Sequence, residues 1–235
     1  MRYFVPCFDS DTADSSRLRE FVDTRIESVS GPQGQPTRAL YQEVRRRGGA
    51  ATQNDFILFD WDPSRTQGYL RYWLKLQPDL ERIMPSRGMW RLLMEWKEAP
   101  SIPGISGDFQ YRWGLYIANA MPQRPGLAWR LEASRTEPNV TGFTTDWAKW
   151  NYTLPVPIGE WFQLEVEWSS HLENGRLLAR ANGQVIAEHL GPTQRTHGLG
   201  KLYMFMVYTA AESTNIGPAY QWVDEVELWE AGPGR

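Results

Sequence analysis

Apolar and polar residues alternate along most of the 235-residue chain, a period typical of β-strands with one buried face. In the segment 69–76 one side of the expected strand carries Leu70, Tyr72, Leu74 and Leu76. In 161–168 one side carries Phe162, Leu164, Val166 and Trp168. Further runs predict strands at 38–45, 55–60, 89–97, 110–118, 127–134, 201–209 and 220–229. Many strands with little intervening helix predict an all-β fold, either a two-sheet antiparallel β-sandwich or a barrel.

One hairpin and one helix are specified more locally. Asn182-Gly183 separates the runs 177–181 and 184–188, and this pair supplies the positive φ angles that a two-residue type I′ turn needs. Helical spacing occurs in 15–29, where we expect a helix with Leu18, Phe21, Val22 and Ile26 on one face. Pro and Gly cluster between the strands, so residues 1–235 are expected to form a single domain.

The aromatic content adds a candidate ligand. Twelve Trp and ten Tyr suit pleated sheets, and their rings also stack on the apolar faces of sugars. The net charge of −3 gives no reason to expect nucleic acid or an anionic membrane as a partner. Cys7 is the single cysteine, so neither an intramolecular disulfide nor a cysteine-based metal site is expected. We expect a monomer, which is secreted or periplasmic if a signal peptide has been removed and intracellular otherwise.

Two C-terminal segments resemble a known fold family. Residues 159–169 (GEWFQLEVEWS), followed by 174–186 (NGRLLARANGQVI), resemble a strand and hairpin of concanavalin A-like jelly rolls. The segment 220–229 (YQWVDEVELW) resembles the closing strand of such domains. Within that superfamily the chain is similar to heparinase-like and alginate-lyase-like polysaccharide lyases in three further segments, 37–45, 90–97 and 201–209. The resemblance runs from about residue 37 to 229 and implies a jelly roll that holds a uronate-containing polysaccharide in the groove of its concave sheet.

Two departures from the lyase pattern leave the activity open. Where those lyases carry a Gln-x-His motif this chain has Glu95 and Lys97, and their Arg-Ser-Glu motif is not recognisable near 52–58. Cleavage by β-elimination therefore stands beside two alternatives. One is a non-catalytic carbohydrate-binding module, and the other is a structural or adhesion domain without sugar chemistry.

β-Elimination needs a group that neutralises the uronate carboxylate, a base for the C5 proton and an acid for the leaving oxygen. Regular alternation in 89–97 places Arg91, Glu95 and Lys97 opposite an apolar face formed by Trp90, Leu92, Met94 and Trp96. Arg91 and Lys97 could bind a carboxylate, and Lys97 could act as base if its pKa is lowered. Tyr208 or Tyr203 could supply the acid or base, and alternation puts them on opposite faces. The resemblance favours Tyr208. The structural alternative is a solvated face with a Glu95–Lys97 ion pair.

Other residues are candidates for binding substrate. Arg71 and Trp73 share a face of their strand and could form a sugar platform with an anion contact. Arg130 lies opposite Trp129 and Leu131 on its strand and could bind substrate. Hydrolysis by a carboxylate pair is disfavoured, because the Glu-x-Asp-x-x-Glu motif of concanavalin-like glucanases is absent.

No cofactor is required for this chemistry. The three histidines at 171, 189 and 197 lack the spacing of transition-metal ligands. The resemblance to jelly rolls with structural calcium makes Asp224 a candidate calcium ligand, together with backbone carbonyls.

Overall fold

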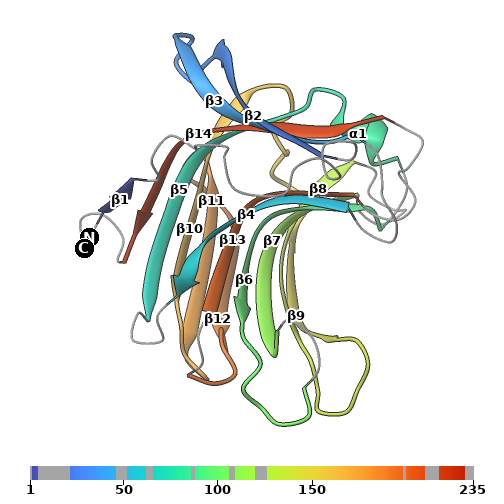
Figure 1. Ribbon diagram of the computed structural model, residues 1–235, viewed down its shortest axis with the longest axis vertical. Helices are drawn as coiled ribbons and strands as arrows, with labels where there is room; N and C mark the ends of the chain where they lie inside the picture. Colours follow the sequence, from blue (N-terminus) through green and yellow to red (C-terminus); the bar gives the residue numbers. More distant parts are fainter. Residues whose placement is uncertain are drawn as a thin grey trace.

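The computed structural model describes residues 2–4, 22–45, 52–61, 66–85, 88–105, 109–119, 126–197, 200–209 and 217–230. For 2–4, 22, 52–61 and 200–209 it describes the backbone alone. Within these ranges the chain folds into two antiparallel sheets that pack face to face, which confirms the predicted β-sandwich (Figure 1). No helix in the described part of the chain has the length and apolar character needed to cross a lipid bilayer.

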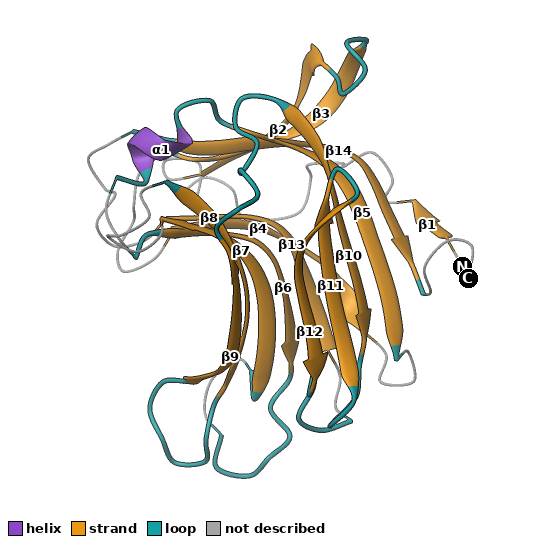
Figure 2. Cartoon of the chain, turned by 180° about the vertical axis from the view of Figure 1, so that it is seen from behind, coloured by secondary structure: helices purple, strands orange, loops and turns teal. Residues whose placement is uncertain are grey.

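The larger sheet has eight strands. In spatial order seven of them are β12 (Gln184–Gly191), β11 (Gly175–Ala181), β10 (Trp161–Ser169), β5 (Gln67–Leu76), β14 (Ala219–Trp229), β3 (Pro36–Val44) and β2 (Val22–Ser30). The eighth, β1 (Arg2–Phe4), pairs with β14. The smaller sheet has the order β4 (Thr52–Trp61), β13 (Gly200–Thr209), β6 (Trp90–Glu98), β7 (Tyr111–Asn119), β8 (Leu127–Arg135) and β9 (Thr144–Asn151). One short helix, α1 (Leu80–Ile83), follows β5 (Figure 2).

Both sheets are strongly curved. The six-stranded sheet bends so that the side turned away from the eight-stranded sheet is hollowed, and we call this side the concave face (Figure 1). The eight-stranded sheet wraps around the opposite side, and its solvent side is called the outer face. The two faces therefore lie on opposite sides of one shared core.

Aromatic side chains fill the space between the sheets. Trp96 and Trp113 stack with ring centroids 6.2 Å apart, and Trp168 from the opposing sheet meets Trp113 at 5.8 Å. All three are at most 1% exposed. Gly68 lies against Trp168 so closely that a Cβ there would be 2.1 Å from the indole ring. Truncating a buried aromatic of this kind typically costs about 3–5 kcal/mol of stability.

The hairpin prediction is confirmed and the helix prediction is wrong. Asn182 and Gly183 have φ angles of 49° and 75° and join β11 to β12. Residues 22–30, expected to end a helix, form the strand β2, in which Ile26 pairs with Leu40 and packs against the core. The spacing of Val22, Ile26 and Val29 fits a helix, and the pairing of the whole segment with β3 overrides that local preference. The rest of the expected helix lies outside the described residues.

Candidate functional site

A β-bulge in β6 decides which of its side chains reach the concave face. The β6–β7 register shifts between Leu92 and Met94, so β6 contains one extra residue, Leu93. Before the bulge, Trp90 and Leu92 cluster with Tyr116, apart from the main core. Beyond it, Met94 and Trp96 belong to the main core. Glu95 and Lys97 therefore lie on the concave face, as predicted, whereas Trp90 and Leu92 are not the core residues that regular alternation predicts.

Arg91 lies between the two sheets, and the prediction that it shares a face with Glu95 is wrong. Its side chain is 1% exposed. One guanidinium nitrogen, Nη2, donates to Gln77 Oε1 at 2.8 Å, and Nη1 donates to the carbonyl of Tyr220 at 3.1 Å. Burial lowers the pKa of Arg91 to about 9. These contacts tie β6 to the eight-stranded sheet and keep Arg91 away from any ligand on the concave face.

Glu95 is the centre of a charged cluster on the concave face. It is 1% exposed and takes a 3.1 Å hydrogen bond from Arg112 Nη1 on one oxygen, with Lys97 Nζ 3.3 Å from the other. Arg112 and Lys97 are cross-strand partners, and Gly114 is the partner of Glu95. An alanine Cβ at Gly114 would be 2.8 Å from Leu92 Cδ1 and 3.0 Å from the Tyr116 ring. Glycine therefore lets the cluster pack tightly beside Tyr116.

Arg112 is held by two aromatic rings and was not singled out from the sequence. Its guanidinium carbon is 4.5 Å from the Phe109 ring centroid and 4.3 Å from that of Phe143. Phe109 is buried and Phe143 is 55% exposed, so the stack joins the core to the surface. Trp113, Leu115 and Ile117 belong to the core, and this alternation along 110–118 is the signal that identifies position 112 as facing the other side.

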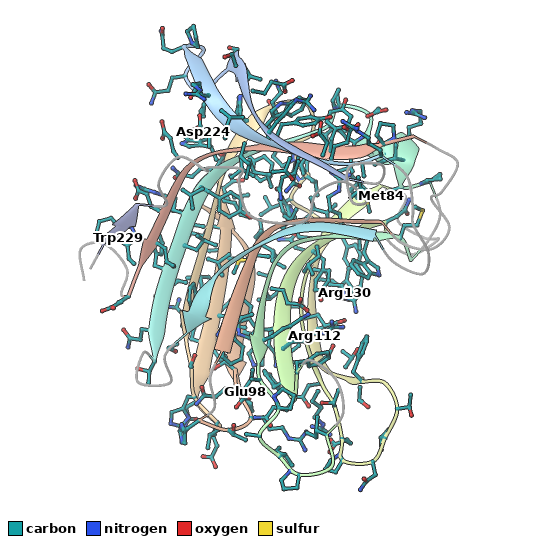
Figure 3. All side chains as sticks on the ribbon, viewed as in Figure 1. Met84, Glu98, Arg112, Arg130, Asp224 and Trp229 are labelled. Carbon is teal, nitrogen blue, oxygen red and sulfur yellow. The ribbon has the colours of Figure 1, made fainter. Side chains whose placement is uncertain are left out.

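A second group on the concave face surrounds Arg130. Arg130 forms an ion pair with Glu132, and its guanidinium carbon is 5.6 Å from the ring centroid of Tyr116 and 5.0 Å from that of Trp150. Trp150 in turn stacks on Tyr152. Burial, followed by the charge of Glu95, raises the pKa of Tyr116 to about 12, so its phenol stays protonated at neutral pH. Burial also lowers the pKa of Arg130. Figure 3 shows Arg112 and Arg130 on the same side of the six-stranded sheet.

The net charge of these two groups follows from their described residues. The two groups contain three cations, Lys97, Arg112 and Arg130, and two carboxylates, Glu95 and Glu132. Three minus two leaves one positive charge, in a setting where low exposure strengthens electrostatic interactions. This balance suits an anionic ligand.

Arg71 and Trp73 share a face, as predicted, but it belongs to the other sheet. The alternate residues Tyr72 and Leu74 are in the core, so Arg71 and Trp73 lie on the outer face of β5. Arg71 Nη2 is 2.6 Å from a carboxylate oxygen of Glu227. These two residues therefore cannot contribute to a site shared with Glu95 and Arg130.

The two candidate tyrosines fall on β13, whose side chains lie outside the described set. In the backbone register Tyr203 is the cross-strand partner of Glu95, and Tyr208 pairs with Gln53 of β4. The β13–β4 register contains an extra residue between Met204 and Val207. The regular alternation on which their predicted placement on opposite faces depends does not run through this strand.

Asp224 lies on β14, on the far side of the sandwich from Arg112 and Arg130 (Figure 3). Its carboxylate accepts hydrogen bonds of 2.8 Å from the Thr37 hydroxyl and from the Glu225 amide. Among the described residues, no three His, Cys, Asp or Glu side chains are grouped to hold a metal ion. A calcium ion at Asp224 remains a prediction.

Comparison with known proteins identifies the fold. No protein-family model and no curated protein sequence matches the chain. Among solved structures, an endo-β-1,4-glucuronan lyase from the fungus Trichoderma reesei is similar, with a TM-score of 0.62 and 13% identity over 87% of this chain and 86% of that one. Alginate lyase Aly36B has a TM-score of 0.55 and 12% identity over 81% of this chain and 80% of that one. A doubly substituted Aly36B in complex with an alginate trisaccharide has a TM-score of 0.54 and 12% identity, over 88% and 97% of the two chains. The chain has the jelly-roll fold of these polysaccharide lyases.

Proposed function

We propose that this chain binds a uronate-containing polysaccharide along the concave face and cleaves it by β-elimination. The cluster of Lys97, Arg112 and Glu95 on that face is the observation that carries the proposal. The similar structures support it, since they include a glucuronan lyase and an alginate lyase that was captured with an alginate trisaccharide. Both of those polymers consist of uronates.

Arg112 and Lys97 are the groups that would neutralise the substrate carboxylate. Withdrawing negative charge from that carboxylate makes the neighbouring C5 proton more acidic, and fixed cations in a partly buried site do this more effectively than water. Lys97 forms an ion pair with Glu95, an arrangement that suits charge neutralisation better than the role of base considered from the sequence. The stack on Phe109 and Phe143 fixes the guanidinium plane of Arg112 before substrate arrives.

We assign Tyr203 as the residue that exchanges protons with the substrate. Its support is the backbone register, in which Tyr203 is opposite Glu95, whereas Tyr208 lies beyond the residues of β13 that pair with β6. One tyrosine can take the C5 proton as a phenolate and return a proton to the leaving oxygen as a phenol. Arg130 and Trp150 would hold a neighbouring sugar through its carboxylate and its ring.

Glu95 also favours a second candidate function, a carbohydrate-binding module without turnover. Its carboxylate already contacts both Arg112 and Lys97, so a substrate carboxylate has to compete with it. Competition of this kind permits retention of a polyuronate on the surface but weakens the activation of its C5 proton.

A spectroscopic assay separates the two functions. β-Elimination creates an unsaturated sugar that absorbs in the near ultraviolet, so the protein is incubated with alginate, glucuronan, heparin and pectin in turn. We expect absorbance to rise with at least one of them. Arg112→Ala should lower the rate by about 100-fold or more, as loss of one preorganised charge contact typically does. The matched control is Arg180→Ala, which removes an ion-paired arginine of the eight-stranded sheet.

Tyr203→Phe and Tyr208→Phe test the tyrosine assignment in the same assay. Tyr203→Phe should lose about 100-fold or more in rate, and Tyr208→Phe should retain most of it. The reverse result would transfer the role to Tyr208. No product from any polymer, combined with retardation in a polyuronate gel, would establish the binding module instead.

A further inference from the structure

A row of two cationic and three aromatic side chains crosses the outer face. In the strand register Arg25 is the partner of Tyr41, Tyr41 of Trp222, Trp222 of Lys75 and Lys75 of Trp161. We call these five residues the outer-face row. It spans five adjacent strands, roughly 19 Å measured along the sheet at the usual strand spacing.

Cation–π contacts join two pairs of residues within the row. The guanidinium carbon of Arg25 is 3.9 Å from the Tyr41 ring centroid, and Lys75 Nζ is 5.5 Å from that of Trp222. Tyr41 is 7% exposed beneath Arg25, whereas Trp222 and Trp161 remain partly exposed. Trp73, two residues before Lys75 on β5, is partly exposed on the same face. The accessible part of the row is therefore two indoles on either side of a lysine.

The indole N–H group of each accessible tryptophan already donates a hydrogen bond within the protein. Trp222 Nε1 donates to Glu27 Oε2 at 2.6 Å, and Trp161 Nε1 donates to the carbonyl of Ser30 at 2.7 Å. Each ring is fixed in orientation by that bond, and a ligand can meet only its apolar surface. A fixed, exposed indole ring suits stacking against the apolar face of a sugar.

The charges around the row cancel. Arg25 pairs with Asp23 and Glu27, and Arg45 pairs with Asp23 and Glu43. Among the described residues, Lys75 and the ion-pair network that contains Arg25 together comprise three cations and three carboxylates. Three minus three leaves no net charge, in contrast to the single positive charge of the two groups described on the concave face. This balance offers nothing to a polyanion and suits an uncharged ligand.

We infer that the outer face is a second carbohydrate-binding site, and that its ligand is a neutral polysaccharide whose pyranose rings stack on Trp222 and Trp161. The strands that carry the site belong to the eight-stranded sheet, so the site lies on the opposite side of the core from the concave face and uses none of its residues (Figure 1). The protein can therefore hold a neutral polymer on one side while the concave face meets an anionic one. The inference goes beyond the proposed function and does not depend on it.

Affinity electrophoresis tests this site with defined probes. The full chain is run in gels that contain hydroxyethylcellulose, a neutral β-linked glucan, or alginate. We expect retardation by hydroxyethylcellulose that is insensitive to salt, because no charge is involved. Trp161→Ala should weaken this affinity by about tenfold, the scale of stacking on one aromatic ring, and Trp161→Phe should retain most of it. Trp150→Ala, on the concave face, is the matched control and should leave it unchanged.

Three results would overturn the inference. They are no retardation of the unaltered chain by hydroxyethylcellulose, equal retardation of Trp161→Ala and Trp161→Phe, or loss of retardation in Trp150→Ala. A row that only stabilised the sheet would change the thermal midpoint of Trp161→Ala without changing the affinity of the folded fraction. If Trp161→Ala is still retarded by alginate as strongly as the unaltered chain, that retardation arises from the concave face alone. The proposed function and the proposed outer-face site can therefore fail separately.

Discussion

The ring of Phe143 covers one side of the Arg112 guanidinium, with 4.3 Å between the guanidinium carbon and the ring centroid. The Phe109 ring centroid is 4.5 Å from the same carbon and 6.1 Å from that of Phe143, so the two adjacent rings form a corner around the guanidinium while Nη1 donates to Glu95. An exposed aromatic residue on a loop thus completes the environment of a buried ion pair. A surface position can be tested for its influence on the site without disturbing the core.

Phe143→Ala should alter ligand binding more than stability. Because Phe143 is 55% exposed, we expect the free energy of unfolding to fall by only about 1 kcal/mol, the scale of a partly exposed cation–π contact. Affinity for a polyuronate should change several-fold, since Arg112 loses one of the rings that fix its orientation. Urea denaturation and affinity electrophoresis measure the two effects. Val140→Ala, on the same loop and 54% exposed, is the control and should change neither.

Arg91→Met should destabilise the fold and spare the site. The substitution removes the hydrogen bonds that Arg91 donates to Gln77 Oε1 and to the Tyr220 carbonyl. This loss should lower the free energy of unfolding by about 2–4 kcal/mol. Binding of a polyuronate by the folded protein should not change. The exposed Arg82→Met, which loses a surface ion pair with Asp79, should cost less than about 1 kcal/mol. A selective loss of binding in Arg91→Met would contradict the interior role.

Mild acid should destabilise the protein through His189. This ring stacks on Trp147 with centroids 3.7 Å apart, and its Nε2 is 3.1 Å from the Pro192 carbonyl, while its buried Nδ1 has no hydrogen-bond partner. Burial lowers the pKa of His189 below the ordinary value of 6.5, so the unfolded chain binds a proton more readily than the folded one.

The stabilising contribution of His189 is therefore complete above about pH 6.5 and is lost as the pH falls toward the lowered folded-state pKa. Urea titrations at about pH 7.5 and pH 5.5 should show a smaller free energy of unfolding at the lower pH. His189→Phe keeps a ring against Trp147 and should reduce that difference. The exposed His171 and His197 provide control substitutions, and an equal reduction in either of those variants would remove the assignment to His189.

Gly68→Ala should be among the most damaging single-methyl additions. The new Cβ would lie 2.1 Å from the ring of Trp168, which is itself packed against Trp113. Relief requires the indole or the backbone of β5 to move, and overpacking of this kind costs about 1–3 kcal/mol or more. Thermal denaturation measures the loss. Gly183→Ala, where no atom lies within 4 Å but φ is 75°, separates backbone strain from steric overlap and should cost about 1 kcal/mol.

Local patterns predicted most of the strands but not the relations between them. Regular alternation in β5 and β10 and the Asn182-Gly183 turn specify their own structure. Which sheet a strand joins depends on distant partners, so the sequence could not place Arg71 and Arg130 on opposite sides of the core. The β-strand at 144–151 was missed because its exposed, polar edge position leaves no apolar alternation to detect.

The candidate site was predicted in part for a similar reason. Counting positions from 89 to 97 assigns Glu95 and Lys97 correctly but misplaces Arg91, because the bulge arises from pairing with β7 and has no signature within the segment. Arg112 could have been found by applying the same alternation to 110–118. Its contact with Phe143 depends on the path of a loop and could not have been anticipated.

The extra residue in β6 also bears on how this strand could change in length. Without Leu93, uninterrupted alternation would still turn Arg91 inward and Glu95 toward the ligand side, because the bulge accommodates just that one residue. A homologue that lacks the residue at position 93 would thus present the same charged cluster and would lose only the core packing of one leucine side chain. Sequence alignments of this region should therefore place a one-residue gap at the bulge, between Leu92 and Glu95.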